Sequence, residues 1–94
     1  MIICFMQFNS NIMFRVIKEY LKWFYDHINY GGVQEDLIIC SYKIKVVQNV
    51  MDGKVFALVI HLYKGDEYIK RFDVKNMKKN NINMVVENIL SYIK

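Results

Sequence analysis

Several residue types that mark common enzyme and cofactor motifs are scarce or missing in this sequence of 94 residues. It has no proline, two cysteines, two histidines and four glycines. The glycines form no phosphate-binding loop, the cysteines and histidines have no paired spacing, and no serine lies in a nucleophile motif. These absences exclude the usual signatures of nucleotide binding, zinc binding and nucleophilic catalysis. We therefore expect a protein that is not an enzyme and needs no cofactor.

The few cysteines and histidines also provide no local metal site. Cys4 and Cys40 are far apart and each lies in an apolar run, which favours buried, reduced thiols. His27 and His61 are equally isolated, and Asp26 beside His27 points around its helix rather than toward it. A metal site could only combine distant residues, so we expect none.

Arginine and alanine are rare too, whereas 13 isoleucines, 11 lysines and 9 asparagines are present. This bias is typical of AT-rich codons and indicates a low-GC genome, such as that of a phage or mobile element. Because such codons raise the lysine content in general, the net charge of +4 is a weak indicator of nucleic-acid binding.

Long hydrophobic runs are absent as well. The longest uncharged run, residues 1–14, is too short to cross a bilayer, and "MIICFMQF" lacks the basic start of a secretory signal. We expect a cytoplasmic protein, in the host-cell cytoplasm if a phage encodes it. With 54% apolar residues, the chain can form one core, and we expect a single domain over residues 1–94.

Residues 11–29 have the apolar period of an amphipathic helix. The stripe that should face the core consists of Met13, Ile17, Leu21, Phe24 and Ile28. An aromatic flank, defined here as Val16, Tyr20, Trp23 and His27, widens the apolar arc. This flank is either a second packing contact inside the domain or a partner-binding edge anchored by Trp23.

Three segments, 37–50, 54–64 and 67–74, alternate with the period of strands, with apolar residues such as Ile44, Ile60 and Phe72 at even positions. Cys40, Phe56 and Tyr68 share this even face. A three-residue loop, Met51 to Gly53, pairs Ile44 with Ile60, Val46 with Leu58 and Tyr42 with Leu62, so we prefer it to a two-residue turn. The same argument favours an odd-length loop around Gly65.

A second amphipathic helix follows over residues 80–94, with Ile82, Val85, Val86, Ile89 and Ile93 at helical spacing. Residues 1–8 are either an edge strand, which we favour slightly, or an extra helical turn. The pattern predicts an α+β two-layer sandwich in the order (β)-α-β-β-β-α. Its antiparallel meander of three or four strands has both helices on one face.

The odd positions of the strands carry Lys43, Lys45 and Arg71 around apolar residues. If the helices cover only the even face, this odd face is exposed and can bind a partner, although central strands are often apolar on both sides. We therefore take the candidate protein-binding residues to be Tyr20, Trp23, His27, Lys43, Lys45 and Arg71.

The stretch "DVKNMKKNN" places Lys75, Lys78 and Lys79 ahead of the second predicted helix. Over residues 11–94, the order of helix, three antiparallel strands and helix resembles the double-stranded RNA-binding domain, which has a basic cluster at this helix entrance. The resemblance implies that these three lysines contact phosphates. The family's long loop between its first two strands corresponds here to the short "MDGK". The lysines also suit a solvated surface.

Three functional hypotheses follow from this pattern. The first is a non-enzymatic domain, encoded by a phage or mobile element, that binds and inhibits a host protein or nucleoprotein complex, for example a CRISPR or other defence nuclease. The second is an RNA-binding module that uses the basic helix entrance. The third is a homo-oligomeric structural protein, such as a homodimer, joined through the odd sheet face.

Overall fold

The computed structural model describes residues 2–3, 10–75 and 79–93 as an α+β fold with one mixed sheet. The strands lie in the order β1-β2-β3-β4-β5, and all neighbours are antiparallel except β1 and β2, which are parallel. The elements are β1 (Ile2–Ile3), α1 (Ser10–Asp26), a 3-10 helix (Tyr30–Gly32), β2 (Leu37–Ile39), β3 (Tyr42–Met51), β4 (Lys54–Lys64), β5 (Glu67–Val74) and α2 (Lys79–Tyr92).

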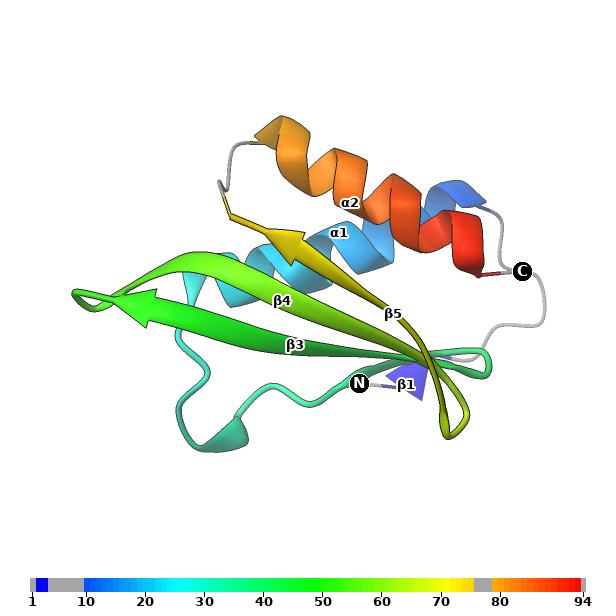
Figure 1. The fold of residues 1–94 in the computed structure, drawn as a ribbon, viewed down its shortest axis with the longest axis horizontal. Helices are drawn as coiled ribbons and strands as arrows, with labels where there is room; N and C mark the ends of the chain where they lie inside the picture. The colour runs from blue at the N-terminus through cyan, green and yellow to red at the C-terminus, as the bar shows by residue number, and fades with distance from the viewer. Residues whose placement is uncertain (1, 4–9, 76–78, 94) are drawn as a thin grey trace.

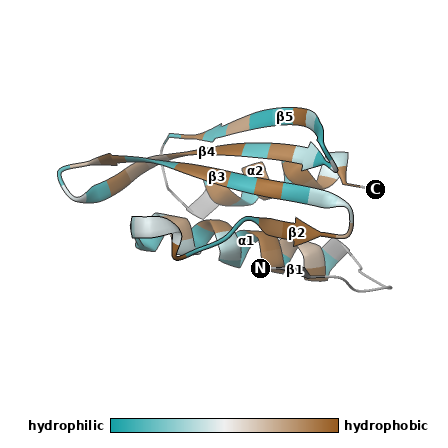
Figure 2. Ribbon diagram, turned by 90° about the horizontal axis from the view of Figure 1, so that it is seen from below, coloured by the Kyte–Doolittle hydropathy of each residue, from teal (hydrophilic) through white to brown (hydrophobic). Residues whose placement is uncertain are grey.

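Both helices pack on the same face of the sheet, which confirms the predicted two-layer architecture. Figure 1 shows α1 and α2 side by side, and Figure 2 shows both on one side of strands β3 to β5. Ile44, Ile60 and Phe72 face this helical layer and are buried, as the alternation of apolar residues predicts. The apolar stripes of the two helices complete the core.

Helix α1 follows the predicted stripe, with Ile17, Leu21 and Phe24 buried, but it ends at Asp26 rather than at residue 29. A side chain from the sheet binds the exposed carbonyls of its last turn. Gln48 on β3 donates from Nε2 to the carbonyl oxygens of Phe24 and His27. These groups have no partner within a helix, so this capping from a distant strand fixes where α1 ends.

Both long hairpins have two-residue turns, so the prediction of odd-length loops was wrong. Met51 pairs with Lys54 across Asp52 and Gly53, which have φ angles of 54° and 75° and so match a type I′ turn. Lys64 pairs with Glu67 in the same way. A two-residue turn alone would pair even with odd positions, and a bulge in each hairpin corrects this.

The bulges explain why the core face is still even-numbered along most of the sheet. The register shifts between Asn49 and Val50, opposite an extra residue on β4, and again between Leu62 and Tyr63, opposite an extra residue on β5. On the side of the bulge away from the turn, even positions of β3 pair with even positions of β4. The pairing is two residues further along β4 than predicted, so that Ile44 pairs with Leu62, Val46 with Ile60, and Tyr42 with Lys64.

Two residues at the bulges or between a bulge and its turn lie on the opposite side from their predicted one. Phe56 is 46% exposed and Tyr68 is 49% exposed, although both belong to the even set. Val55, an odd residue, is buried in the core instead, and Ile69 packs against the core. The reversal is local because each bulge changes the side-chain alternation only up to the nearest turn.

The first predicted strand, 37–50, is in fact a tight hairpin. Cys40 and Ser41 form the turn between β2 and β3, and Cys40 has a φ of 55°. Leu37 and Ile39 therefore face the core, whereas the Cys40 thiol is free and exposed. The prediction of a buried thiol at Cys40 was wrong because the turn reverses the chain there.

The ends of the chain agree with the prediction where the structure describes them. Ile2–Ile3 forms the short edge strand β1, whereas the rest of the 1–8 segment, Cys4 included, lies outside the described residues. Helix α2 begins at Lys79, one residue before the predicted segment. It buries the expected positions Ile82, Val86, Ile89 and Ile93.

Candidate functional site

The side of the sheet that faces away from the helices carries a group of cationic and aromatic side chains. We call this the outer face; its central residues are Lys43, Lys45, His61, Tyr63, Tyr68 and Arg71. In the described part of the chain, no helix or strand covers it, as Figure 2 shows. The strands hold these side chains in two rows that run across β3, β4 and β5.

The first row contains Lys45, His61 and Arg71. Lys45 pairs directly with His61, and His61 pairs directly with Arg71. Because neighbouring strands lie about 4.8 Å apart, this basic row crosses the sheet in roughly 10 Å. Arg71 Nε donates to Asp73 Oδ1 at 3.0 Å, and both side chains remain largely exposed. The row therefore presents positive charge to solvent with one carboxylate at its margin.

The second row contains two tyrosines and a lysine. Lys43 pairs with Tyr63, which pairs with Tyr68, and the Lys43 ammonium lies 4.6 Å from the Tyr63 ring centroid. The two tyrosine rings meet edge to face at 5.2 Å. The Tyr68 hydroxyl lies 3.1 Å from Nδ1 of His61, within hydrogen-bond distance, so the tyrosine row is connected to the basic row.

The aromatic flank of α1 is not part of this face. Trp23 is half-buried and packs against the core, and His27 stacks on it with ring centroids 4.9 Å apart. Tyr20 is 3% exposed and donates from its hydroxyl to the carbonyl oxygen of Glu35 at 2.7 Å. Tyr20 is therefore a core residue, so it is removed from the candidate binding residues.

The other five predicted protein-binding residues thus separate into two groups on different layers. Lys43, Lys45 and Arg71 come together on the outer face, whereas Trp23 and His27 lie in the helical layer. Backbone pairing fixes the spacing of the outer-face residues relative to one another.

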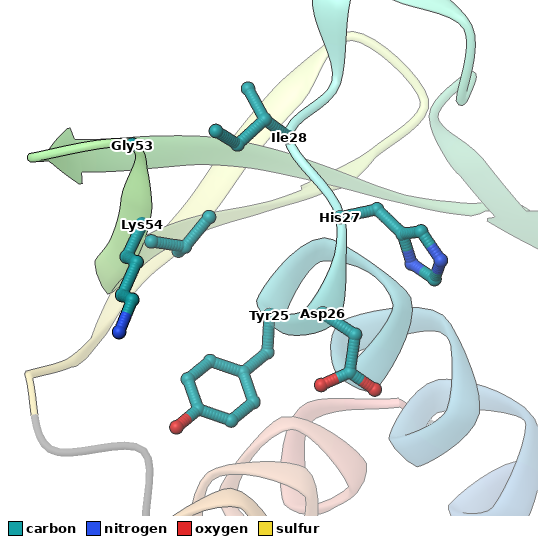
Figure 3. Close-up of a pocket in the computed structure, with 7 residues that line it drawn as sticks. Tyr25, Asp26, His27, Ile28, Gly53 and Lys54 are labelled. Atoms are coloured by element: carbon teal, nitrogen blue, oxygen red, sulfur yellow. The ribbon is translucent and has the colours of Figure 1, made fainter.

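A hollow of about 310 Å³ lies between the end of α1 and the tip of the β3–β4 hairpin. Figure 3 shows Tyr25, Asp26 and Lys54 around it, with the His27 ring pointing away from Lys54. Within the described chain, no ion pair joins Asp26 to His27 or Lys54. The hollow therefore contains no dyad of the kind that acid–base catalysis needs.

The predicted phosphate contacts at the helix entrance lie partly outside the described residues. Lys75 is exposed just after β5, Lys79 is the first residue of α2, and Lys78 lies outside the described chain. Lys79 therefore begins the helix instead of preceding it. The three lysines remain a prediction, separate from the outer face.

In residues 2–3, 10–75 and 79–93, no three histidine, cysteine, aspartate or glutamate side chains gather closely enough to hold a metal ion. Neither described helix has both the length and the apolar content needed to span a membrane.

Compared with protein-family models, with curated proteins and with solved structures, the chain matches none of them.

Sequence reasoning found the three cations of this face but missed the exposed ring of Tyr68. Even numbering assigned Tyr68 to the core, and only the bulge at Ile69 turns it outward. The available signal was the Gly65-Asp66 pair, because Gly at the first central position is typical of a two-residue hairpin turn. Such a turn requires a bulge here to keep the apolar residues on one side.

Proposed function

We propose that this chain is a non-enzymatic binding domain that presents the outer face to another macromolecule. One observation supports this most: the sheet is asymmetric, with both helices packed on one face and ordered cationic and aromatic residues on the other. Exposed patches in which apolar or aromatic side chains are rimmed by polar residues often mark interaction sites. A rigid sheet also positions side chains for binding with little loss of conformational entropy.

The proposed partner is a host protein or nucleoprotein complex that the domain inhibits when it binds, for instance a CRISPR or other defence nuclease. Small size and the codon bias of a low-GC phage or mobile element support this setting. Binding would take place in the cytoplasm. Inhibition would result from covering a surface of the complex.

Capture from a lysate of a low-GC bacterium tests this proposal. The tagged domain is compared with the Lys43→Glu/Lys45→Glu variant and with Trp23→Ala, and each captured set is identified by mass spectrometry. We expect the double variant to lose the partner, because reversing two adjacent charges repels the surface that the wild type attracts. Trp23→Ala, in the helical layer, should retain it.

Two outcomes would contradict the proposal. An identical captured set with the double variant would show that the outer face does not bind. Loss of the partner with Trp23→Ala alone would place the contact on the aromatic flank. The circular dichroism spectrum and melting temperature of each variant control for folding, since Lys45 is exposed and its replacement should cost little stability.

Self-association through the outer face is the other structural possibility. In a two-fold dimer, the same patch meets itself, so the cations of one chain would lie close to those of its partner. Juxtaposed like charges oppose this contact. The charge on the outer face thus favours a different macromolecule over a second copy, and light scattering that gave the mass of a dimer would argue against the proposal.

A further inference from the structure

We infer that the outer face binds single-stranded nucleic acid, with its cations on phosphates and the Tyr68 ring stacked on a base. The inference rests on the proposed function and names the chemistry of the partner. Proteins that bind single strands combine a cationic track for the backbone with exposed aromatic rings for the bases. The basic row and the tyrosine row supply these two elements side by side.

The charge pattern of the face favours nucleic acid over a protein partner. Lysine is depleted at the centre of protein–protein interfaces, yet Lys43 and Lys45 occupy successive outward positions of β3, in the middle of the sheet. Successive outward residues lie about 6.7 Å apart along a strand. Together with Arg71 two strands away, the lysines form a positive area that an extended polyanion complements.

The aromatic geometry favours a strand with accessible bases over a duplex. Tyr68 is 49% exposed, and its ring forms no parallel stack with either neighbour, since it meets Tyr63 in a T-shaped contact and His61 at a tilt of 50°. Tyr63 already has a cation over its ring, which leaves Tyr68 as the stacking residue. In a duplex the bases are paired and stacked inside, where the Tyr68 ring cannot stack on them.

The hydrogen-bond distance between His61 and Tyr68 connects the two binding elements. His61 lies between Lys45 and Arg71 in the basic row, and its Nδ1 lies 3.1 Å from the Tyr68 hydroxyl. This contact restricts the rotation of the Tyr68 ring next to the cations. The ring and the positive charges are therefore held close enough for one nucleotide to meet both, with its base on Tyr68 and its phosphate on the basic row.

Fluorescence anisotropy with labelled oligothymidylate and oligouridylate of about 12 nucleotides, within the known range of site sizes, tests the inference. The triple variant Lys43→Gln/Lys45→Gln/Arg71→Gln should bind at least about tenfold more weakly. The slope of log affinity against log salt should fall by about 2, since each contacted phosphate of a single strand contributes roughly 0.7.

The matched control removes two lysines and one arginine from other exposed positions, as Arg15→Gln/Lys22→Gln/Lys54→Gln. It has the same net charge as the triple variant, and it should keep the wild-type affinity. If both triple variants lose affinity equally, binding reflects net charge alone and the inference is overturned.

The stacking role is tested separately at Tyr68. Tyr68→Ala should weaken binding roughly tenfold, because stacking one base contributes about 1 to 3 kcal/mol. Tyr68→Phe retains the ring and should keep most of the affinity, whereas Tyr68→Leu should not. The control is Tyr30→Ala, which removes an exposed tyrosine of the 3-10 helix and should change nothing. Equal affinity of Tyr68→Leu and wild type would overturn the stacking.

Two further results would overturn the inference as a whole. One is equal or tighter binding of a duplex of the same length. The other is no binding of either oligonucleotide at low salt. If, in that case, nuclease-treated lysate still yields a protein whose capture requires Lys43 and Lys45, then the proposed function stands and its partner is a protein. If nothing depends on the outer face, both fail.

Discussion

At the residue scale, Tyr20 shows how one polar atom fits into the apolar core. Its ring is buried against Phe24 with centroids 5.0 Å apart, and its hydroxyl donates to the carbonyl oxygen of Glu35 just before β2. Burial raises the pKa of Tyr20 well above its ordinary value, and the nearby charge of Asp36 raises it further. The hydroxyl is therefore neutral in the folded protein at neutral pH.

This environment predicts alkaline destabilisation that depends on one side chain. Because the pKa of Tyr20 is raised in the folded state, the folded protein holds this proton more tightly than the unfolded chain does. Its contribution to stability is complete below the unfolded pKa of about 10 and is lost as the pH rises above it. Urea unfolding of wild type and Tyr20→Phe at neutral and high pH measures this.

We expect Tyr20→Phe to cost about 0.5 to 1.5 kcal/mol at neutral pH, the usual value of one hydrogen bond. At high pH the difference between the two proteins should shrink, since phenylalanine cannot ionise. A difference that stays constant or widens with pH would contradict the assignment of Tyr20 as a neutral core donor.

The alternation of apolar and polar residues along the strands allowed most of the core and most of the outer face to be predicted. Ile44, Ile60 and Phe72 are buried because two-residue periodicity is a direct consequence of strand geometry. The sequence could not decide between core and partner contact for the aromatic flank. The Tyr20 hydroxyl donates to the carbonyl of Glu35 across a loop, and no local sequence pattern reveals a contact between residues so far apart in the chain.

At the scale of elements, a glutamine on β3 connects the sheet to the end of α1. Gln48 Nε2 donates to two helix carbonyls, and its Oε1 accepts a hydrogen bond from the backbone N–H of Asn29. Three backbone groups at the helix end are thus satisfied by one side chain. Asn29 in turn bonds both backbone groups of Gln34, which shapes the loop that leads to β2.

We predict that Gln48→Leu lowers the free energy of unfolding by about 1 to 3 kcal/mol, because it leaves partly buried backbone groups without partners. Gln48→Glu provides an informative comparison. It keeps an acceptor for Asn29 but loses both donors and adds a negative charge at the helix C-terminus, which is unfavourable. Chemical denaturation measures both.

If the capping is correct, Gln48→Glu is at least as destabilised as Gln48→Leu at neutral pH and recovers partly below about pH 4, where a protonated carboxyl can donate. A Gln48→Leu protein as stable as wild type would show that solvent satisfies these carbonyls equally well.

The hairpins show where sequence reasoning reaches its limit. A three-residue loop and a two-residue turn followed by a bulge both keep even residues on one side, so the alternation could not distinguish them. With three-residue loops Phe56 and Tyr68 would face the core, whereas the two-residue turns with their bulges leave both exposed. The conformation of Asp52 and Gly53 decides the outcome, through a turn whose backbone twist matches that of the strands.

At the scale of the whole molecule, the two faces of the sheet differ: one is apolar and covered by the helices, and the other is exposed and carries charge. The helical face provides stability, since α1 and α2 bury their apolar stripes there. The outer face is then free to carry charge, because its cations remain hydrated and need no compensating partner within the fold. This division is possible only because both helices lie on the same side, which places the proposed binding residues on rigid strands.

The most direct test of this account is an NMR titration of the isotope-labelled chain with single-stranded oligothymidylate. We predict that the largest chemical-shift changes occur at the side chains and amides of Lys43, Lys45, Tyr68 and Arg71, with α1 unaffected. Changes that centre on Trp23 and His27, or on Lys75 and Lys79 at the entrance to α2, would contradict the claim that this domain binds through its outer face.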